Sequence, residues 1–254
     1  MEGFIRFIGT GGARVVASSQ VRSTGGLWLG YRGTNVYIDP GPGALVRLHD
    51  AGDHLRPADL DGIILTHKHL DHANDVNIMI EAMAQAGRAK KGVLFCTGDA
   101  IGEDGVVFRY VRKYLEEIEL LREKGEYRVK NITFSVPVRH VHSVEAYGLI
   151  FHLNKTIGLI ADTRFFDELP DCYPVDILIA NVLRVEPIGK EDPIDHLSVA
   201  DFRRIITRIR PEVSIMTHFG ATMIKDNPDL IAEALRAETG LDVKAAHDGM
   251  VWDF

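Results

Sequence analysis

The chain has 254 residues, of which 46% are hydrophobic and 26% charged, and its formal net charge is −7. This composition is that of an ordinary globular protein and excludes a disordered chain. No apolar run approaches the roughly 18 residues that a membrane-spanning helix needs, which excludes a membrane-spanning chain. The acidic total gives no support to a large nucleic-acid interface that depends on clustered Lys and Arg.

The first half of the chain begins with β-strands. Apolar residues alternate with other residues in "GFIRFI", "GLWLGY" and "NVYID", which Gly, Asn or Pro bound. The glycines of Thr10–Gly12 predict a tight turn close to any site at this sheet edge. Helices and strands then alternate, with a short helix near 45–48, a strand at 63–65, a helix at 76–86 and a strand at 93–96. This order predicts helices layered on sheets.

The stretch "VVFRYVRKYLEEIELLREKGE", residues 106–126, places apolar residues at spacings of three and four and ends near Gly125. That period is typical of an amphipathic helix with one face against the core. We therefore predict a helical insertion over about 103–126.

The second half repeats the alternation of strands and helices. Strands are predicted at "NITFSV", "YGLIFHL", "TIGLIA", "DILIA", "VSIMT", "VKAA" and "MVWDF". Helices are predicted over 199–210 and 228–238, with Ser198 and Asn227 as N-caps. No internal repeat or linker divides the chain, so we expect one domain over residues 1–254. Because the N-terminus lacks a basic head followed by an apolar core, we expect a cytoplasmic location.

A dense cluster of potential metal ligands follows the predicted strand at 63–65. The segment "THKHLDHAND" contains the pattern H-x-H-x-D-H, made of His67, His69, Asp71 and His72. In an extended stretch, His67 and His69 project to the same side, and the following turn swings Asp71 and His72 towards a second position. The segment therefore predicts ligands for two metal ions.

Two ions need further ligands, and the chain offers them where later strands end. "VRHVHSVEAYG" contains His140 and His142, "GLIADTRFF" contains Asp162, and "VSIMTHFG" contains His218. Four other histidines have no ligand-like neighbours in the sequence and are expected at the surface or in the core: His49, His54, His152 and His247. Cys96 and Cys172 lack the spacing of a thiolate site.

The order H-x-H-x-D-H, a later His, an Asp and a final His resembles the metallo-β-lactamase superfamily along essentially the whole chain. The resemblance implies an α/β fold of the αββα sandwich type. It also implies a first metal held by His67, His69 and His142, a second held by Asp71, His72 and His218, and Asp162 as the bridge between them.

The ribonuclease Z-like branch of that superfamily fits best. It implies His142 rather than His140 as the ligand, because "EAYG" follows His142 by three residues, and it implies His196 in "DHLSVADFRR" as a catalytic histidine that binds no metal. "FIGTGGA" and "YIDPGPG" also resemble this branch. Only 20 residues separate His142 from Asp162, which leaves no room for the tRNA-binding arm of ribonuclease Z proper.

We expect two divalent ions, zinc first and manganese or iron next, since the ligands are histidine and carboxylate without thiolate. A hydroxide that bridges them would attack a phosphorus or carbonyl centre, with Asp71 orienting it and His196 bonding the transition-state oxygen or protonating the leaving group. The leading hypothesis is a phosphodiesterase acting on a small or cyclic phosphodiester.

Several alternatives stay open at this stage. One is a lactone or thioester hydrolase, another is a nuclease acting on RNA or DNA, and homodimer formation is also open. A redox di-iron centre is disfavoured because His69 stands where such relatives have an acid. A binding protein without activity is disfavoured because no ligand of the pattern is missing.

Overall fold

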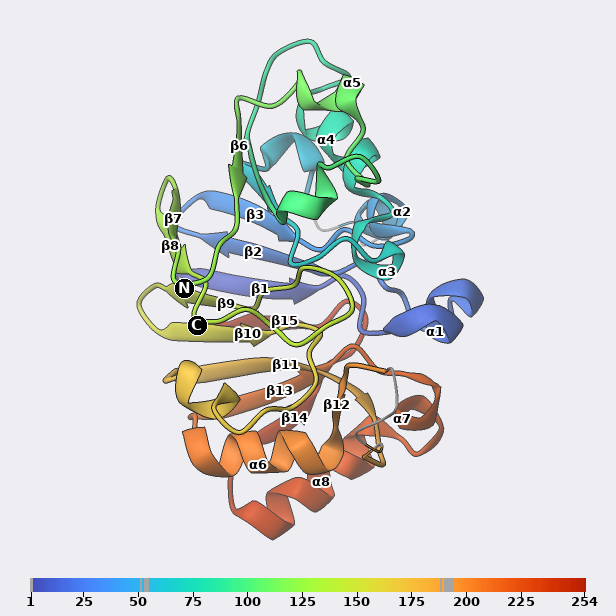
Figure 1. Cartoon of the computed structure of the whole chain (residues 1–254), viewed down its shortest axis with the longest axis vertical. Helices are drawn as coiled ribbons and strands as arrows, with labels where there is room; N and C mark the ends of the chain where they lie inside the picture. The colour runs from blue at the N-terminus through green and yellow to red at the C-terminus, as the bar shows by residue number, and fades with distance from the viewer. Residues whose placement is uncertain (1, 51, 53–54, 188, 190–193) are drawn as a thin grey trace.

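The computed structural model describes residues 2–50, 52, 55–187, 189 and 194–254. Two β-sheets pack face to face, and helices cover the outer face of each (Figure 1). Figure 1 places both chain ends at one end of the strands, whereas α1 (Ala13–Ser19) projects at the opposite end. The αββα sandwich predicted from the sequence is confirmed.

The first sheet carries the N-terminal half of the chain. Over the described residues it has seven strands, in the order β15 (Val251–Asp253), β1 (Gly3–Phe7), β2 (Leu27–Tyr31), β3 (Thr34–Ile38), β4 (Gly62–Ile64), β5 (Val93–Cys96) and β6 (Glu117–Leu120). The strands from β3 to β6 run parallel, so their carboxyl ends share one edge.

The second sheet is built from the C-terminal half. Its described strands follow the order β14 (Val243–Ala245), β13 (Val213–Thr217), β11 (Ile177–Arg184), β10 (Thr156–Ile160), β9 (Leu149–His152), β8 (Ile132–Ser135) and β7 (Glu126–Val129), and β12 (Leu197–Ser198) pairs with β11. Strands β10, β11, β13 and β14 run parallel, which again brings carboxyl ends together.

The period-two patterns of the strands divide their side chains between three apolar layers. In β4, Ile64 faces the other sheet, whereas Ile63 faces the helices. In β11, Ile179 faces the other sheet and Leu178 faces the helices on its own side. Both faces of each central strand are thus buried, which is why these strands are apolar throughout.

The helices cover the two outer layers. On the first sheet lie α2 (Ala44–Asp50), α4 (Val76–Met83) and the short α5 (Arg109–Arg112), with α3 (Leu70–Ala73) at the sheet edge. On the second sheet lie α6 (Val199–Ile209) and α8 (Pro228–Thr239), with α7 (Ala221–Lys225) between β13 and α8. The 3₁₀ turns are η1 (Pro57–Asp59), η2 (Gly98–Ala100) and η3 (Leu169–Cys172).

Both predicted helix caps are confirmed. The Ser198 hydroxyl accepts a hydrogen bond from the Asp201 N–H, and the Asp201 carboxylate accepts from the Ser198 N–H, which is a capping box at the start of α6. The Asn227 side chain accepts from the Asp229 N–H at the start of α8.

The helix predicted over residues 106–126 is wrong. Only α5 is helical there, and the chain then forms β6 and enters β7. Glu117 to Leu120 alternates charged and apolar residues, so its pattern fits a strand as well as a helix. The open edge of β5 decides between them, because β6 pairs with it in parallel, Ile118 opposite Leu94. Hydrogen bonds to β5 replace those that a helix would have formed locally.

Among the described residues, no helix has both the length and the apolar character that crossing a membrane requires.

We expect the inter-sheet layer to dominate stability, and Phe134→Ala tests this. Phe134 is 1% exposed, and its ring lies 5.0 Å from that of Phe95 and 5.7 Å from that of Phe151, between centroids. Its truncation should lower the free energy of unfolding by about 3–5 kcal/mol, measured by urea denaturation. Phe108→Ala removes the same ring from a position that is 53% exposed and should change stability little. Equal losses in the two variants would contradict this assignment.

Candidate metal centre

Seven side chains predicted as ligands meet at one end of the two sheets. The positions that carry them lie just beyond strand ends, in loops or in the short helix α3 at that edge, where parallel strands leave functional groups. They come from the loop after β4, from α3, from the loop between β8 and β9, and from the ends of β10 and β13: His67, His69, Asp71, His72, His142, Asp162 and His218.

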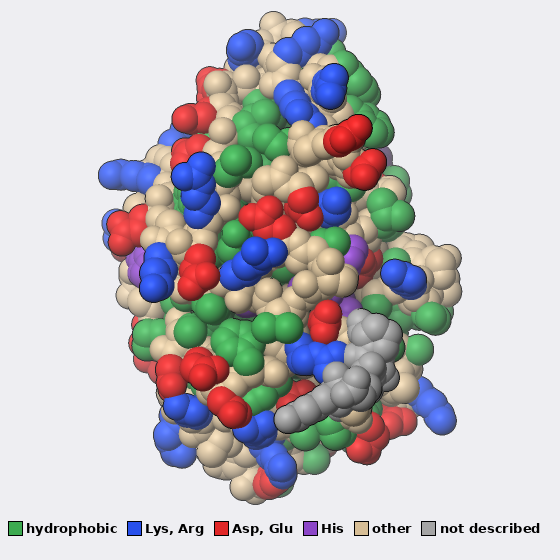
Figure 2. Space-filling view, in the orientation of Figure 1, with side chains coloured by type: hydrophobic (Ala, Val, Ile, Leu, Met, Phe, Trp, Pro, Cys, Tyr) green, Lys and Arg blue, Asp and Glu red, His purple; other side chains and the backbone are tan. Residues whose placement is uncertain are grey.

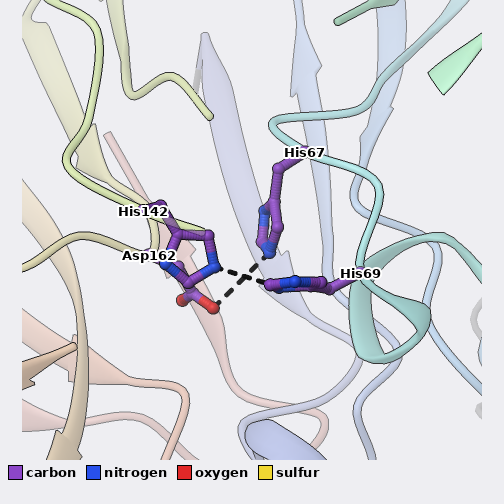
Figure 3. Close-up of side chains that lie close together, drawn as sticks. All are labelled: His67, His69, His142 and Asp162. Carbon is purple, nitrogen blue, oxygen red and sulfur yellow. Dashed lines mark hydrogen bonds and ion pairs between the residues drawn. The ribbon is translucent and has the colours of Figure 1, made fainter. Parts of the chain in front are cut away.

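Figure 3 shows one half of this cluster, in which three histidines from two loops point towards the Asp162 carboxylate. One potential ligand atom from each of His67, His69, His142 and Asp162 lies within 4.8 Å of the others. The Nε2 atom of His142 is 3.0 Å from Nδ1 of His69, and Nε2 of His67 is 3.6 Å from Oδ2 of Asp162. Nitrogen atoms this close around a carboxylate suit a single small cation.

The other half consists of Asp71, His72, His218 and the same Asp162, again with ligand atoms within 4.8 Å of one another. Nε2 of His218 lies 3.3 Å from Oδ2 of Asp71 and 3.4 Å from Oδ1 of Asp162. Nε2 of His72 lies 3.3 Å from Oδ2 of Asp162. The two halves therefore share one carboxylate.

The shared carboxylate is buried, since Asp162 is 1% exposed. Burial by itself raises the pKa of a carboxyl group, but His218, His196 and His72 outweigh it and hold the pKa of Asp162 well below its usual value. The Asn181 side chain donates a hydrogen bond to Oδ1 at 2.8 Å. Asp162 is thus held as an anion at the centre of the cluster.

The hydrogen bonding of two buried atoms indicates whether a cation fits the cluster. Over the described residues, Nε2 of His67 and Oδ2 of Asp162 are buried and have no hydrogen-bond partner. Buried polar atoms without partners are costly, and these two face each other across the position that a shared ion would take. The donor set therefore fits divalent cations, which would satisfy both atoms.

The electrostatics of the histidines agree with this fit. Burial, with nearby His72, lowers the pKa of His67 well below its usual value, which keeps the imidazole in the neutral form that binds metals. Burial also opposes protonation of His72, but Asp162 and Asp71 outweigh it and raise the pKa of His72 well above its usual value. The carboxylates thus attract positive charge to this half of the cluster.

A buried carboxylate outside the cluster orients His72. Asp39 follows β3, and its Oδ2 atom lies 3.0 Å from Nδ1 of His72. The N–H and hydroxyl of Thr66 both donate to Asp39, and the same hydroxyl lies 3.1 Å from Nδ1 of His67. Such partners fix which nitrogen of a histidine faces a metal. The motif "YIDPGPG" contained Asp39, but no local signal in the sequence assigned it this contact.

The segment Thr10–Gly12 lies close to the cluster, as predicted, but it is not a tight turn, because Gly11 forms a β-bridge with Phe219 and Gly12 has an extended backbone. His218 has a left-handed backbone, with φ +60°, directly after β13. A Cβ atom placed on Gly12 would lie 2.1 Å from Nδ1 of His218, so only glycine leaves room for the ring. The next residue, Ala13, donates its N–H to Oδ2 of Asp71 at 2.7 Å. One segment therefore contacts two members of the same half.

The structure separates the two histidines that the sequence left as alternatives. His142 enters the cluster, whereas His140 is buried beneath it, with Nδ1 3.2 Å from the Asp162 carbonyl oxygen and Nε2 2.8 Å from the Tyr173 hydroxyl. Burial lowers the pKa of His140 to about 4. His140 is thus placed to support the Asp162 backbone.

His196 lies beside the cluster. Its Nδ1 atom is 3.5 Å from Oδ2 of Asp162, and its ring stacks at 5.6 Å from that of His218. Burial lowers its pKa to about 4, so the imidazole is neutral at neutral pH. His196, His69 and His142 are only partly buried, and Figure 2 shows histidine side chains at the surface beside the α1 projection. The cluster is therefore open to solvent on this side.

The remaining histidines lie away from the cluster. His49 is exposed, exposed His152 contacts Ser135, and exposed His247 contacts Asp229. His54 is outside the described residues.

Comparison with known proteins gives both a family match and a relative along nearly the whole chain. Residues 34–219 match the family model described as the beta-lactamase superfamily domain. The chain is 31% identical over 256 residues to the uncharacterized protein MJ1374 of Methanocaldococcus jannaschii, an alignment that covers 97% of this chain and 93% of the relative.

Solved structures share the fold at low sequence identity. The metallo-beta-lactamase fold protein YhfI from Bacillus subtilis superposes with a TM-score of 0.81 at 17% identity, with 99% of each chain covered. Human tRNase Z, short form, gives 0.73 at 17% identity over 98% of each chain. A diphosphatase from the PhnP family gives 0.70 at 18% identity, over 99% of this chain and 98% of the other.

Gly12→Ala tests the geometry of the half that contains His218. The new methyl group should displace the His218 ring and weaken the uptake of one of two divalent ions, measured by titration of the metal-free protein with Co²⁺ and its visible absorption. Gly102→Ala is the matched control, because its Cβ would meet only ordinary contacts at 3.6 Å and beyond. Unchanged uptake in Gly12→Ala would show that the contact does not position His218.

Proposed function

Because this chain belongs to the beta-lactamase superfamily, we propose that it is a metal-dependent hydrolase with a dinuclear centre. One observation carries the proposal: two groups of ligand atoms share Asp162, and the buried Nε2 of His67 and Oδ2 of Asp162 have no hydrogen-bond partner among the described residues. A pair of divalent cations supplies Lewis acidity and makes water nucleophilic at neutral pH.

Each half of the cluster would hold one ion. His67, His69 and His142 would bind the first, and Asp71, His72 and His218 the second, with Asp162 between them. Histidine and carboxylate ligands without thiolate suit zinc, manganese and iron, and zinc is our first choice. The contacts of His72 with Asp39 and of His67 with Thr66 support this assignment, because they leave the Nε2 atoms free to face the ions.

Asp71 and His196 are the catalytic residues of this proposal. The Asp71 carboxylate accepts the Ala13 N–H, which leaves its other lone pairs to orient the attacking water. A neutral His196 would donate a hydrogen bond to the substrate oxygen that gains charge in the transition state. Its position beside Asp162, on the open side of the cluster, supports this role.

A small or cyclic phosphodiester is the substrate class that we favour. Structural neighbours include a PhnP-family diphosphatase and a tRNase Z, both named for cleavage of phosphate-containing substrates. Strands β9 and β10 lie between His142 and Asp162 and are joined by residues 153–155 alone, so no RNA-binding arm projects there. This favours a small substrate over a large RNA.

Loss of a ligand should remove both metal and activity. We expect His67→Ala and Asp71→Ala to lose one or both ions, measured by elemental analysis, and to lose turnover of bis-p-nitrophenyl phosphate. A chelator should inactivate the wild type, and zinc or manganese should restore it. His152→Ala, which removes an exposed histidine, should change neither property. A ligand variant with full metal content and full activity would end the assignment.

His196→Ala should separate chemistry from metal binding. Loss of the donor should lower kcat by roughly a hundred- to ten-thousand-fold, while both ions stay bound. The measurement is steady-state kinetics combined with elemental analysis of the same sample. Retention of wild-type kcat would exclude His196 from the reaction.

Substrate class is tested by parallel assays of one metal-loaded sample. We expect turnover of bis-p-nitrophenyl phosphate and of cyclic phosphodiesters to exceed that of a lactone and thioester panel and that of structured RNA. Carbonyl turnover without phosphodiester turnover would replace our first choice with an esterase-type hydrolase. Preferred cleavage of RNA or DNA would replace it with a nuclease.

A further inference from the structure

One ion pair joins two loops that carry groups of the proposed site. Arg164 lies two residues after Asp162, and Asp195 directly precedes His196. Nε of Arg164 donates to Oδ1 of Asp195 at 2.8 Å, and the two side chains are only 26% and 18% exposed. The pair is therefore largely shielded from water, unlike the other Arg–Asp and Arg–Glu pairs found in the described residues, whose side chains are more exposed.

The backbone of Asp195 contacts a proposed ligand. Its carbonyl oxygen lies 3.1 Å from Nδ1 of His142. A carbonyl oxygen can only accept a hydrogen bond, so Nδ1 carries the proton and Nε2 is left to face the cluster, 3.0 Å from Nδ1 of His69. The position of the Asp195 peptide therefore sets both the tautomer and the direction of the His142 ring.

The same peptide group joins Asp195 to His196 and so affects the position of His196. The His196 N–H donates to the Ile194 carbonyl oxygen, and the chain then enters β12 and the capping box of α6. The His196 ring lies 5.4 Å from that of His142, between centroids. The peptide group between Asp195 and His196 thus contacts His142 and also leads into His196.

Arg164 connects this residue to the rest of the site. Its own N–H donates to the Val141 carbonyl oxygen at 2.8 Å, beside His142, and its Nη1 atom donates to the Gly189 carbonyl oxygen at 3.4 Å. Arg164, which lies in the segment after Asp162, therefore contacts both the segment before His142 and the segment before His196.

We propose that Arg164 and Asp195 act together as a positioning pair that fixes His142 as a metal ligand and His196 as a catalytic residue. The inference rests on the proposed function. The ion pair orients the Asp195 peptide, the peptide orients His142 through its carbonyl oxygen, and it also starts the segment that carries His196. Neither Arg164 nor Asp195 contacts the reacting atoms in this role.

A double-mutant cycle tests the pair in the full-length protein. Arg164→Ala, Asp195→Ala and the double variant should each lower kcat by about ten- to hundredfold, with a much smaller change in KM, as expected when an outer partner of a ligand is lost. The three losses should be nearly equal, because either single change already breaks the pair. Asp195→Asn keeps the shape of the side chain and removes its charge, so it should fold normally and show the same effect in a weaker form.

Metal binding supplies a readout that does not depend on turnover. Titration of the metal-free proteins with zinc against a chromophoric chelator should show one of two ions bound about ten- to hundredfold more weakly in the variants. Arg203→Ala is the matched control, since it breaks the exposed pair of Arg203 with Glu238 between α6 and α8. It should leave kcat and both zinc affinities unchanged.

The outcomes separate this inference from the function on which it rests. A wild-type protein that binds two ions and turns over substrate, with variants that match it in kcat and zinc affinity, would overturn the positioning role alone. Losses that simply add in the double variant would also overturn it, because two independent contributions are not a pair. A wild-type protein that binds no divalent ion would overturn both proposals.

Discussion

The structure depends on one buried carboxylate surrounded by histidines. Asp162 is anionic inside the protein, and burial alone would make that state unfavourable. It persists because histidines from both halves of the chain surround it, with Asn181 as a hydrogen-bond donor. The two sheets must therefore meet in a fixed register at this edge, or Asp162 would face apolar side chains from the opposite sheet.

The fold meets this requirement because each sheet contains a run of parallel strands, whose carboxyl ends lie at the same edge. The three apolar layers keep the sheets and helices rigid, and polar residues are placed beyond the strand ends, where they need not interrupt a layer. The adjoining loops are then fixed by hydrogen bonds to buried groups such as Asp39, Thr66 and His140 rather than by secondary structure. Rigid strands and oriented loops together hold ligand atoms close enough to share a cation.

The partners of the histidines also distinguish the two halves. In one half, His218 and Asp71 contact the segment at Gly12 and Ala13, which comes from the start of the chain. In the other, His142 depends on the Asp195 peptide and so on Arg164. Each half thus has partners of its own, although the two share Asp162 and the contacts of Thr66 and Asp39.

The sequence by itself determined most of the strands, the helices α2, α4, α6 and α8 and, apart from the choice between His140 and His142, the membership of the cluster. Buried strands and capped helices carry their own periodicity and end signals, and H-x-H-x-D-H places four ligand candidates in one short segment, so local chemistry was sufficient there. Only the tertiary structure decided that Glu117 to Leu120 is a strand, because the open edge of β5 is not visible in the residues that pair with it. The choice of His142 over His140 rested on a family resemblance until the structure placed one in the cluster and the other beneath it. The contacts of Asp39, Gly12, Arg164 and Asp195 join residues that are far apart along the chain, and such contacts leave no periodic or local pattern by which the sequence could reveal them.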